Sequence, residues 1–403
     1  MKSNYRKLGE YIREVNIRNT DLRLSTLLGV SVTKEFIPSI ANTVGTDFSK
    51  YKIVKRNQFT YIPDTSRRGD KIGVALLQDY DEALVSQAYT VFEVSDEDKL
   101  NPEYLMMWFR RPEFDRYARF KSEGSVREIF SWNEMCNIEL PVPDIEKQRK
   151  IVEQYNQINK AIQIKEAINN NLEQQCLTNY IKLLDGYTIE SDSLPNGWSI
   201  GCIGDYCDVK SGYAFKSNWW TNSGYKVIKI ANITNNSINL DSCDCVLEEN
   251  ALKAKDFRAV PGDIMIAMTG ATTGKVGIVP TCDDNIVVNQ RVGKFFLGKN
   301  PIERVPFLFS TLIYDRVAYY LQPNGTAGSA QDNLSPDDIK RISIVLPKEE
   351  LIENYNNRFK SLIKVIINNC AEIRALKKIN NILLSKYFTA ENSDSSTAKL
   401  SFI

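Results

Sequence analysis

Two long segments of this 403-residue chain share one pattern, and this repetition constrains the fold more than any other feature. Each segment is about forty residues long, lacks internal glycine and proline, and follows an apolar stretch that ends at a proline. These stretches are "IELPVP" before residues 144–184 and "ISIVLP" before residues 348–388. Proline is tolerated at the start of a helix but not in its interior, so each segment is predicted to form one helix of roughly 60 Å.

Both predicted helices carry residues in heptad spacing, which is typical of a coiled coil. The seam of the first helix comprises Ile151, Tyr155, Ile158, Ile162 and Leu172, and Lys165 and Asn169 interrupt it. The apolar seam residues of the second helix are Leu362, Ile366, Ile373, Leu376 and Leu383. Asn369 and Asn380 occupy the same seam, where polar residues lower stability but fix register and partner. Equal length and heptad phase favour pairing of the two helices over separate packing on two domains.

The repetition extends into the regions that precede the helices. An offset of 204 residues superimposes Pro143 on Pro347 and Gly124-Ser125 on Gly328-Ser329. At slightly different offsets, "LGEY" resembles "IGDY", and "VSQAYTVFEV" resembles "VNQRVGKFFL". The predicted organisation is a globular domain (1–143), a long helix (144–184), a polar linker (185–198), a second globular domain (199–346), a second long helix (347–390) and a flexible tail (391–403).

Short strand patterns and few helices predict an α+β fold with a twisted antiparallel sheet in each globular domain. In the first domain, "KYKIVKRNQFTYIP" reads as strand, turn and strand, and "VALLQDYDEALVSQAYTVFEV" reads as two strands around an acidic turn. The stretch "NPEYLMMWFRRPEFDRYARF" follows and is predicted to be one helix with an apolar side.

The chain contains no histidine, which excludes catalytic triads built on histidine and histidine-ligated metals. Eight scattered cysteines include no C-x₂-C pair. A zinc site built from Cys202, Cys207, Cys243 and Cys245 is the weaker interpretation, and reduced structural thiols are the stronger one. No transmembrane run or signal peptide is recognisable, so a cytoplasmic location is expected.

The stretch "GDIMIAMTGATTGKVGIV" (262–279) looks at first like a phosphate-binding loop. A nucleotide-binding P-loop has four residues between its glycines and a serine or threonine after the lysine. Here three residues separate Gly270 from Gly274, and Val276 follows Lys275. The alternating, β-branched flanks favour a turn between two strands, whose tip is also suited to contact nucleic-acid phosphates.

Two similar domains joined to helices of fixed length suit a long regular substrate such as duplex DNA, in which two different half-sites are separated by a spacer. The net charge is only +1, yet residues 1–75 contain 14 Lys/Arg against 7 Asp/Glu, so a local basic face is compatible with the neutral total.

The duplicated layout, the "LPxP"-type helix starts, "GDIMIAMTG", "NQRVG" and "LPNGW" together resemble the specificity subunit of Type I restriction–modification systems, over nearly the whole chain. The resemblance implies two target recognition domains that read an asymmetric bipartite site in double-stranded DNA. It also implies that the long helices form an antiparallel coiled coil that sets the spacing and docks two methyltransferase subunits, with restriction–translocation subunits as further partners. S-adenosylmethionine, ATP and Mg²⁺ would then belong to those partners, with no cofactor, metal or catalytic residue in this chain.

Residue type indicates the candidate DNA contacts, because arginine pairs with guanine and glutamine or asparagine with adenine, while small and cationic residues suit phosphates. In the first domain they are Arg67, Arg68 and Lys71; Ser86, Gln87 and Tyr89; and Gly124, Ser125 and Arg127. In the second domain they are Lys210, Ser211, Tyr213 and Lys216; Thr269, Thr272, Thr273 and Lys275; Asn289, Gln290 and Arg291; and Gly328, Ser329 and Gln331. For each group the alternative is an ordinary solvated turn, a hinge or a strand edge, and Trp219 and Trp220 are predicted to pack rather than stack on bases.

Two other functions compete with DNA recognition. The first is an enzyme that modifies or cleaves DNA, but neither a methyltransferase tetrapeptide nor a well-spaced nuclease motif is found, since "PDIEK" (143–147) compresses the spacing at a helix start. The second is a coiled-coil scaffold that binds protein only, which predicts no salt-dependent affinity for DNA.

Overall fold

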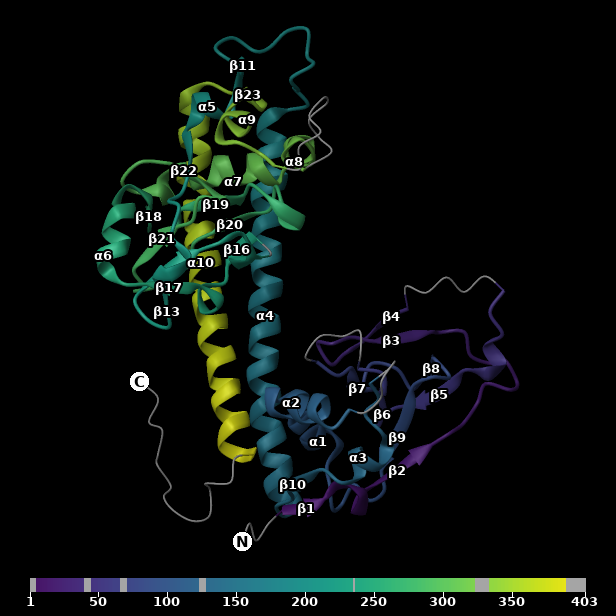
Figure 1. The fold of residues 1–403 in the computed structure, drawn as a ribbon. Coiled ribbons are helices and arrows are strands. Elements are labelled where there is room, and N and C mark those ends of the chain that lie inside the picture. Colours follow the sequence, from purple (N-terminus) through teal and green to yellow (C-terminus); the bar gives the residue numbers. More distant parts are fainter. Residues whose placement is uncertain are drawn as a thin grey trace. The chain divides into compact units, whose positions relative to one another are not determined.

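The computed structural model describes residues 5–39, 45–65, 71–122, 128–234, 236–322 and 333–388. The described chain divides into two compact units: residues 5–159 with 378–388, and residues 160–377. The helices α4 (Ile145–Leu184) and α10 (Glu349–Phe388) are each 40 residues long and contribute to both units (Figure 1). Their bounds lie within two residues of the predicted helices at every end.

The first unit contains one four-stranded antiparallel sheet, three strand pairs and three short helices. The sheet has the order β2 (Ile12–Val15), β9 (Thr90–Val94), β6 (Gln58–Tyr61), β7 (Val74–Leu76). The pairs are β1 (Tyr5–Lys7) with β10 (Glu139–Pro141), β3 (Leu28–Val30) with β4 (Phe36–Pro38), and β5 (Lys52–Lys55) with β8 (Glu82–Val85). The short helices are α1 (Pro102–Phe109), α2 (Pro112–Phe120) and α3 (Trp132–Cys136).

The second unit is built around two larger sheets. The six-stranded sheet has the order β12 (Asp208–Ser211), β22 (Val292–Phe296), β19 (Ile264–Ala267), β20 (Val276–Ile278), β16 (Asn236–Ile238), β15 (Ile233–Thr234). The five-stranded sheet has the order β13 (Trp220–Thr221), β17 (Asp244–Val246), β14 (Tyr225–Ile228), β21 (Ile286–Val288), β18 (Arg258–Ala259). Further elements are the pair β11 (Ser199–Cys202) and β23 (Ser343–Leu346), and helices α5 (Ile203–Tyr206), α6 (Glu248–Ala251), α7 (Val305–Ile313), α8 (Asp315–Leu321) and α9 (Pro336–Lys340).

The two units repeat one topology. The strand order β2-β9-β6-β7 recurs as β12-β22-β19-β20, and in both units every neighbouring pair in this set is antiparallel. The pair β1·β10 corresponds to β11·β23, and β5·β8 corresponds to β18·β21. Helices α1, α2, α3 and α4 follow in the same order as α7, α8, α9 and α10. The fold-class prediction of a duplicated α+β domain with a long helix after each copy is therefore confirmed.

Three details differ from the sequence predictions. The stretch predicted as one helix over residues 101–120 forms α1 and α2, which are separated at Arg110 and Arg111, because Pro112 lacks the N–H that a continuous helix requires. Residues 74–94 form three strands rather than two, with the acidic turn between β7 and β8. The second unit is not purely antiparallel, since β14 pairs with β21 and β16 pairs with β20 in parallel.

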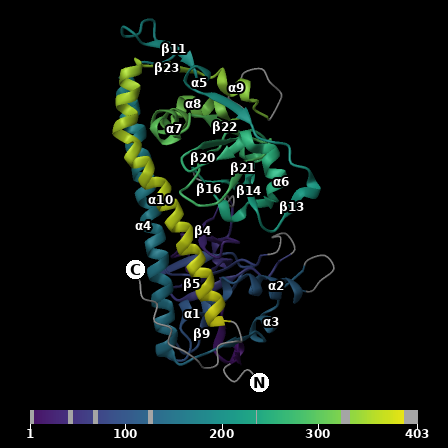
Figure 2. The ribbon, with the colours of Figure 1, turned by 90° about the vertical axis from the view of Figure 1, so that its left-hand side faces the viewer.

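Within each unit, α4 and α10 lie side by side (Figures 1 and 2) and bury part of their surface against the globular part. In the first unit the ring of Phe388 packs 4.9 Å from that of Tyr104 in α1. In the second unit α7 lies between the helix pair and the sheets (Figure 2), and its Phe307 contacts Tyr180 of α4 and Tyr355 of α10. Each helix pair is therefore part of the core of its unit.

The two helices run antiparallel, as the hydrogen bonds between them show. In the first unit, Asn380 donates to Asn159 (2.7 Å) and the Tyr387 hydroxyl donates to Gln154 (3.2 Å). In the second unit, Asn369 donates to Asn169 (2.8 Å). Residue numbers thus rise along one helix as they fall along the other, as the prediction of an antiparallel coiled coil requires.

The predicted seam residues all lie at least partly buried in the structure. Buried are Ile151, Tyr155, Ile162, Ile366 and Ile373, and partly buried are Ile158, Leu172, Leu362, Leu376 and Leu383. Asn169 and Asn369, which interrupt the apolar pattern, are both buried and satisfy each other. α10 also buries Ile363 and Ile367, outside the predicted seam.

Candidate nucleic-acid interface

The hairpin between β19 and β20 is the glycine-rich loop that resembled a phosphate-binding site. Gly270 and Gly274 have positive φ values of 79° and 85°, which favour glycine. A Cβ on Gly274 would also collide with the carbonyl oxygen of Leu321 at the end of α8. The close approach at Gly274 is thus to the protein's own backbone, and the glycine spacing serves a tight turn rather than a nucleotide cradle.

The side chains at this hairpin tip differ in how free they are to contact a ligand. The hydroxyl of buried Thr273 donates to the carbonyl of Gly270 (2.7 Å), so it stabilises the turn. Thr269 and Thr272 are partly buried, and the Thr269 hydroxyl has no hydrogen-bond partner within the described residues. Lys275 is exposed. Lys275 is therefore the side chain of this loop best placed to reach an anionic ligand.

A second predicted segment, the turn between β21 and β22, lies beside the hairpin. The amide of Met268 donates to the carbonyl of Arg291 (3.1 Å), which joins the two loops. Inside the turn, the side chain of Asn289 accepts from the amide of Arg291 (3.2 Å), while Gln290 and Arg291 are exposed. Asn289 thus has a structural role in the turn, and its two neighbours extend into solvent.

The segment 210–216 joins the same edge of the sheet. The amide of Gln290 donates to the carbonyl of Tyr213 (2.9 Å), and Tyr213 forms a bridge with Asn289. Lys210 is exposed but lies 3.3 Å from Asp208, and partly buried Ser211 pairs in register with Gly293. Three segments predicted separately thus meet where β12, β19 and β22 approach one another.

An aromatic cluster follows this segment. Tyr213 stacks on Trp219, with ring centroids 6.4 Å apart, and Phe215 packs against Trp220 at 5.9 Å. The ammonium of Lys216 lies 5.5 Å from the centroid of the Trp219 ring. Both tryptophans are partly buried in this cluster, which is the packing role predicted for them.

The loop after α8 also reaches the hairpin, since the amide of Leu334 donates to the carbonyl of Met268 (2.8 Å). The predicted contacts in that loop, Gly328, Ser329 and Gln331, lie outside the described residues. The first unit has the equivalent bond, from the amide of Phe130 to the carbonyl of Pro63 (2.9 Å). In both units, therefore, the loop after the second short helix is tied to the central hairpin at the same place.

In the first unit, Arg67, Arg68, Gly124, Ser125 and Arg127 lie outside the described residues. The remaining candidates occupy places equivalent to those in the second unit. Lys71 is exposed on the returning arm of the β6–β7 hairpin, the counterpart of β19–β20. Gln87 is exposed, and Ser86 and Tyr89 are partly buried, in the turn between β8 and β9.

A buried ion pair that the sequence did not reveal holds the arm that carries Lys71. The ammonium of Lys34 lies 2.6 Å from the carboxylate of Asp115 and donates to the carbonyl of Ile72 (3.2 Å), while Asp115 accepts from the amide of Ile72 (3.1 Å). Burial lowers the pKa of Lys34, although its bond to Asp115 opposes the shift. The two residues are 81 positions apart, and no local pattern marks them as partners.

The four cysteines weighed as zinc ligands do not form a metal site. Within the described residues, no group of three or more histidine, cysteine, aspartate or glutamate side chains is placed to hold a metal ion. Burial raises the pKa of Cys207 and of Cys243 to about 12, so both remain thiols at neutral pH. Asp144 of "PDIEK" caps α4 by accepting from the amide of Lys147 (2.9 Å), which accounts for that motif structurally.

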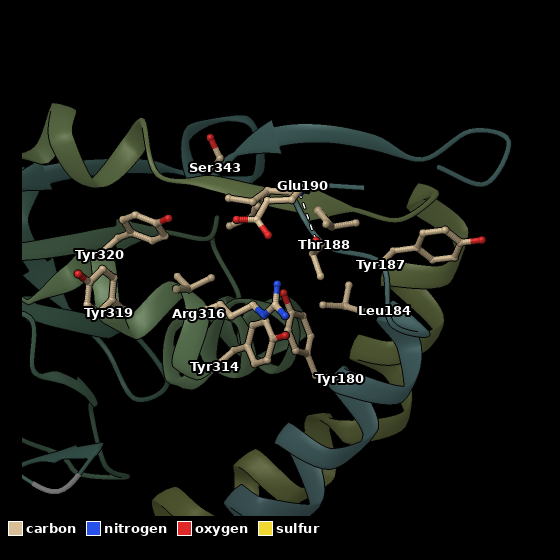
Figure 3. A pocket seen from close by; sticks show the side chains of 14 residues that line it. Tyr180, Leu184, Tyr187, Thr188, Glu190, Tyr314, Arg316, Tyr319, Tyr320 and Ser343 are labelled. Atoms are coloured by element: carbon tan, nitrogen blue, oxygen red, sulfur yellow. Dashed lines mark hydrogen bonds between the residues drawn. The ribbon is translucent and has the colours of Figure 1, made fainter. Parts of the chain in front are cut away.

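A pocket of about 380 Å³ lies in the second unit between the end of α4, the linker after it, α8 and β23 (Figure 3). Tyr180, Tyr314, Tyr319 and Tyr320 supply much of its wall, and Arg316 and Glu190 are its charged residues. Burial raises the pKa of Tyr180 to about 12, so its hydroxyl is neutral. The pocket lining therefore offers a largely aromatic surface. None of the described helices is both long and apolar enough to cross a membrane.

The described residues thus form two copies of one α+β domain, each followed by a long helix. The chain belongs to the family defined by the Type I restriction modification DNA specificity domain, which matches residues 5–174 and again residues 195–383. The two matches coincide with the two copies found in the structure. The family's description names DNA specificity and its matched relatives are specificity subunits, in agreement with the prediction that this chain is a non-catalytic component.

Individual relatives support the same membership. Two Type I restriction enzyme specificity subunits of Methanocaldococcus jannaschii, MjaVIII and MjaIX, are 26% identical over 276 residues and 23% identical over 317 residues. These matches cover 64% and 73% of this chain, and 63% and 70% of the relatives, so the first spans less than two thirds of that protein. The crystal structure of a Type I system S subunit from M. genitalium has the same fold, with a TM-score of 0.54 and 13% identity over 96% of both chains.

Proposed function

We propose that this chain is the non-catalytic DNA-recognition subunit of a Type I restriction–modification complex and reads a bipartite, asymmetric site in double-stranded DNA. Each globular domain reads one half-site. The long helices set the distance between the half-sites and dock two methyltransferase subunits, to which restriction–translocation subunits are added. S-adenosylmethionine, ATP and Mg²⁺ act in those partner subunits.

The observation that carries this proposal is the convergence of equivalent loops with unlike side chains. In the second unit, hydrogen bonds join the central hairpin to the turn after β21 and to Leu334 after the second short helix. In the first unit, Phe130 binds the hairpin at Pro63, and the turn after β8 leads into Thr90, which pairs with Tyr61 at the base of the hairpin. The exposed residues there differ: Ala88 follows Gln87 in the first turn, whereas Arg291 follows Gln290 in the second. A common scaffold with different side chains suits two readers of different base sequences.

The first test is single-molecule methylation sequencing of host DNA with and without the gene. Loss of one asymmetric bipartite methylated motif on deletion, restored by the wild-type gene, is the expected result. An unchanged methylation pattern in cells that produce the methyltransferase subunit would contradict the proposal.

The role of the helices is tested by inserting one heptad into each. Seven residues lengthen a helix by about 10 Å, which corresponds to about three base pairs of B-DNA. The methylated motif is therefore expected to keep both half-sites and to gain a spacer longer by about three base pairs. A motif with the original spacer would exclude a ruler function for the helices.

A coiled-coil scaffold without DNA binding is separated from DNA recognition by salt dependence. The DNA-binding subunit should lose affinity steeply as salt rises from 50 to 200 mM, because each phosphate contact releases counterions. Affinity for duplex DNA that is absent, or present but independent of salt, would favour the scaffold.

A further inference from the structure

The turn after β8 and the turn after β21 have the same internal hydrogen bonds. In the first, the amide of Tyr89 donates to the carbonyl of Ser86 (3.0 Å), and the amide of Ala88 donates to the Ser86 hydroxyl (3.3 Å). In the second, the amide of Val292 donates to the carbonyl of Asn289 (2.9 Å), and the amide of Arg291 donates to the Asn289 side chain (3.2 Å). Serine and asparagine thus perform the same task at the same position.

Both turns also present the same side chain at their tip. Gln87 and Gln290 each occupy the second position of the turn, and both are exposed. Neither side-chain amide hydrogen-bonds to another described residue. The strands that lead into the two turns, β8 and β21, are by contrast largely buried. At the next position the units differ, with Ala88 in one and Arg291 in the other.

We propose that Gln87 and Gln290 make one and the same contact in the two units, a hydrogen bond to the sugar–phosphate backbone of each half-site that is independent of base sequence. This inference rests on the proposed function. It assigns these two residues a positioning role and assigns base discrimination to the side chains that differ between the units, Arg291 among them.

The physical reason is that an identical side chain on an identical turn contacts something that both half-sites contain. Two half-sites of different sequence share the regular geometry of the phosphates rather than their base edges. A glutamine amide donates to a phosphate oxygen while remaining neutral, and the rigid turn gives the bond a fixed direction. Such contacts set the register of a domain on the duplex, from which neighbouring residues read the bases.

The neutrality of glutamine makes the contact distinguishable from an arginine contact by salt dependence. Replacing a cation that binds a phosphate lowers the salt slope of log K by about one, whereas losing a neutral hydrogen bond leaves the slope unchanged. Gln290→Lys would keep a phosphate contact and add a charge. It should therefore retain affinity and raise the salt slope by about one.

The experiment uses the full chain and a duplex that the wild-type chain selects from a random pool. Affinity is measured at several salt concentrations for Gln87→Ala, Gln290→Ala, Gln290→Lys and Arg291→Ala, and selection from the pool is repeated with each variant. Gln174→Ala serves as the control, since Gln174 is an exposed glutamine on α4. Gln87→Ala and Gln290→Ala are each expected to weaken binding by roughly three- to tenfold, with unchanged salt slope and unchanged base preferences.

Three results would overturn the inference. Relaxed base preference in Gln87→Ala or Gln290→Ala would show that the glutamines read bases. This outcome includes the case in which both half-sites contain the same base pair and both glutamines contact it. Affinity equal to that of Gln174→Ala would place both turns outside the interface. A Gln290→Lys variant with an unchanged salt slope would exclude a nearby phosphate. If the wild-type chain selects no sequence and shows no salt-dependent binding, the proposed function itself fails, which is a separate outcome.

Discussion

The two globular domains share one topology but are attached to the long helices in different ways. In the first unit the hydrogen bonds between the globular part and α4 involve Gln148, Arg149 and Asn156, within about 12 Å along the helix. In the second unit, bonds to α10 begin at Tyr355 and end at Arg374, over about 29 Å. The duplicated domain therefore keeps its fold while its anchorage changes.

One position of the long helix binds a glutamate of the globular part in both units, with a change of chemistry. Asn156 donates to Glu103 (2.6 Å) in the first unit, and Lys360, at the 204-residue offset, lies 2.7 Å from Glu303 in the second. Arg374 has no such equivalent, because the same offset leads to Asn170. Its partner Asp241 lies between β16 and β17, which have no counterpart among the described strands of the first unit, whereas Asp284 precedes β21, the counterpart of β8. The comparison separates inherited contacts from those added by the longer sheets.

The largest effects are expected in the two cores, at equivalent phenylalanines. Phe92 and Phe295 are both fully buried, and replacing either by alanine should lower the free energy of unfolding by about 3–5 kcal/mol. The leucine variants should differ: Phe92 stacks on Phe59 (4.8 Å) and contacts Trp132 (5.4 Å), whereas Phe295 makes no ring contact with another described aromatic side chain. Denaturant unfolding should show Phe92→Leu as the more damaging by about 1 kcal/mol.

Phe120→Ala is the control for this pair, since Phe120 is 83% exposed and should change stability by less than about 0.5 kcal/mol. Equal losses for Phe92→Leu and Phe295→Leu would mean that the ring contacts of the first core add nothing beyond burial.

Arg374 tests the anchorage that is unique to the second unit. Arg374→Met removes bonds of 2.6 Å to both Asp241 and Asp284 and should lower the free energy of unfolding by about 2–3 kcal/mol at pH 7. Burial alone would raise the pKa of Asp284, but the bonds from Arg374 and Lys226 outweigh it and hold the pKa below its ordinary value.

This lowered pKa fixes the sign of the pH dependence. An aspartate with a depressed folded-state pKa stabilises the protein above its unfolded pKa of about 3.9, and this stabilisation is lost as pH falls through the folded value. The difference in stability between wild type and Arg374→Met should therefore be constant between pH 7 and 5 and shrink below about pH 4. A difference that stays constant into strong acid would show that the arginine acts by packing alone.

The paired asparagines of the helix seam allow the seam of one unit to be compared with that of the other. Asn169 and Asn369 are both buried, so Asn369→Leu leaves Asn169 without its main partner and should lower the free energy of unfolding by about 1–2 kcal/mol. Asn380→Leu should be less damaging, because Asn159 is only partly buried and the Asn380 carbonyl oxygen already has no partner among the described residues.

The double variant Asn169→Leu/Asn369→Leu separates the cost of a buried polar group without a hydrogen-bond partner from the effect of packing. Stability at or above that of wild type is expected, since an apolar pair leaves no buried polar group unsatisfied. A double variant as unstable as Asn369→Leu would show that the site cannot accommodate apolar side chains.

Much of this architecture was predictable because its signals are local. Heptad spacing in runs without glycine or proline after Pro143 and Pro347 identified both long helices, and alternating flanks identified the β19–β20 hairpin. The break between α1 and α2 was also visible, in the Arg111-Pro112 pair, but apolar periodicity across it favoured a single helix. Local sequence patterns therefore predict the helices and strands, and a helix break at a proline is the signal most easily missed.

What could not be predicted depends on pairing between distant strands. The meeting of segments 210–216, 269–275 and 289–291 follows from β12 and β19 both pairing with β22, which no local pattern specifies. The same holds for Lys34 with Asp115 and for Arg374 with its two aspartates, since each joins segments separated by more than eighty residues. Residue chemistry suggested the candidate DNA contacts, and tertiary pairing decided which of them lie together.

The smallest effect concerns the helix position, Asn156 or Lys360, that binds a glutamate in both units. Asn156→Lys would convert the neutral contact with Glu103 into the ion pair of the second unit, and because Asn156 is exposed the expected gain is about 0.2–0.5 kcal/mol. The gain should disappear in 1 M salt, where the Debye length is about 3 Å. The reverse change, Lys360→Asn, should lose a similar amount at low salt, which thermal unfolding at two salt concentrations would detect. A gain in Asn156→Lys that persists in 1 M salt would show that the longer lysine stem acts by covering apolar surface, and the two anchoring contacts would then be equivalent in position only.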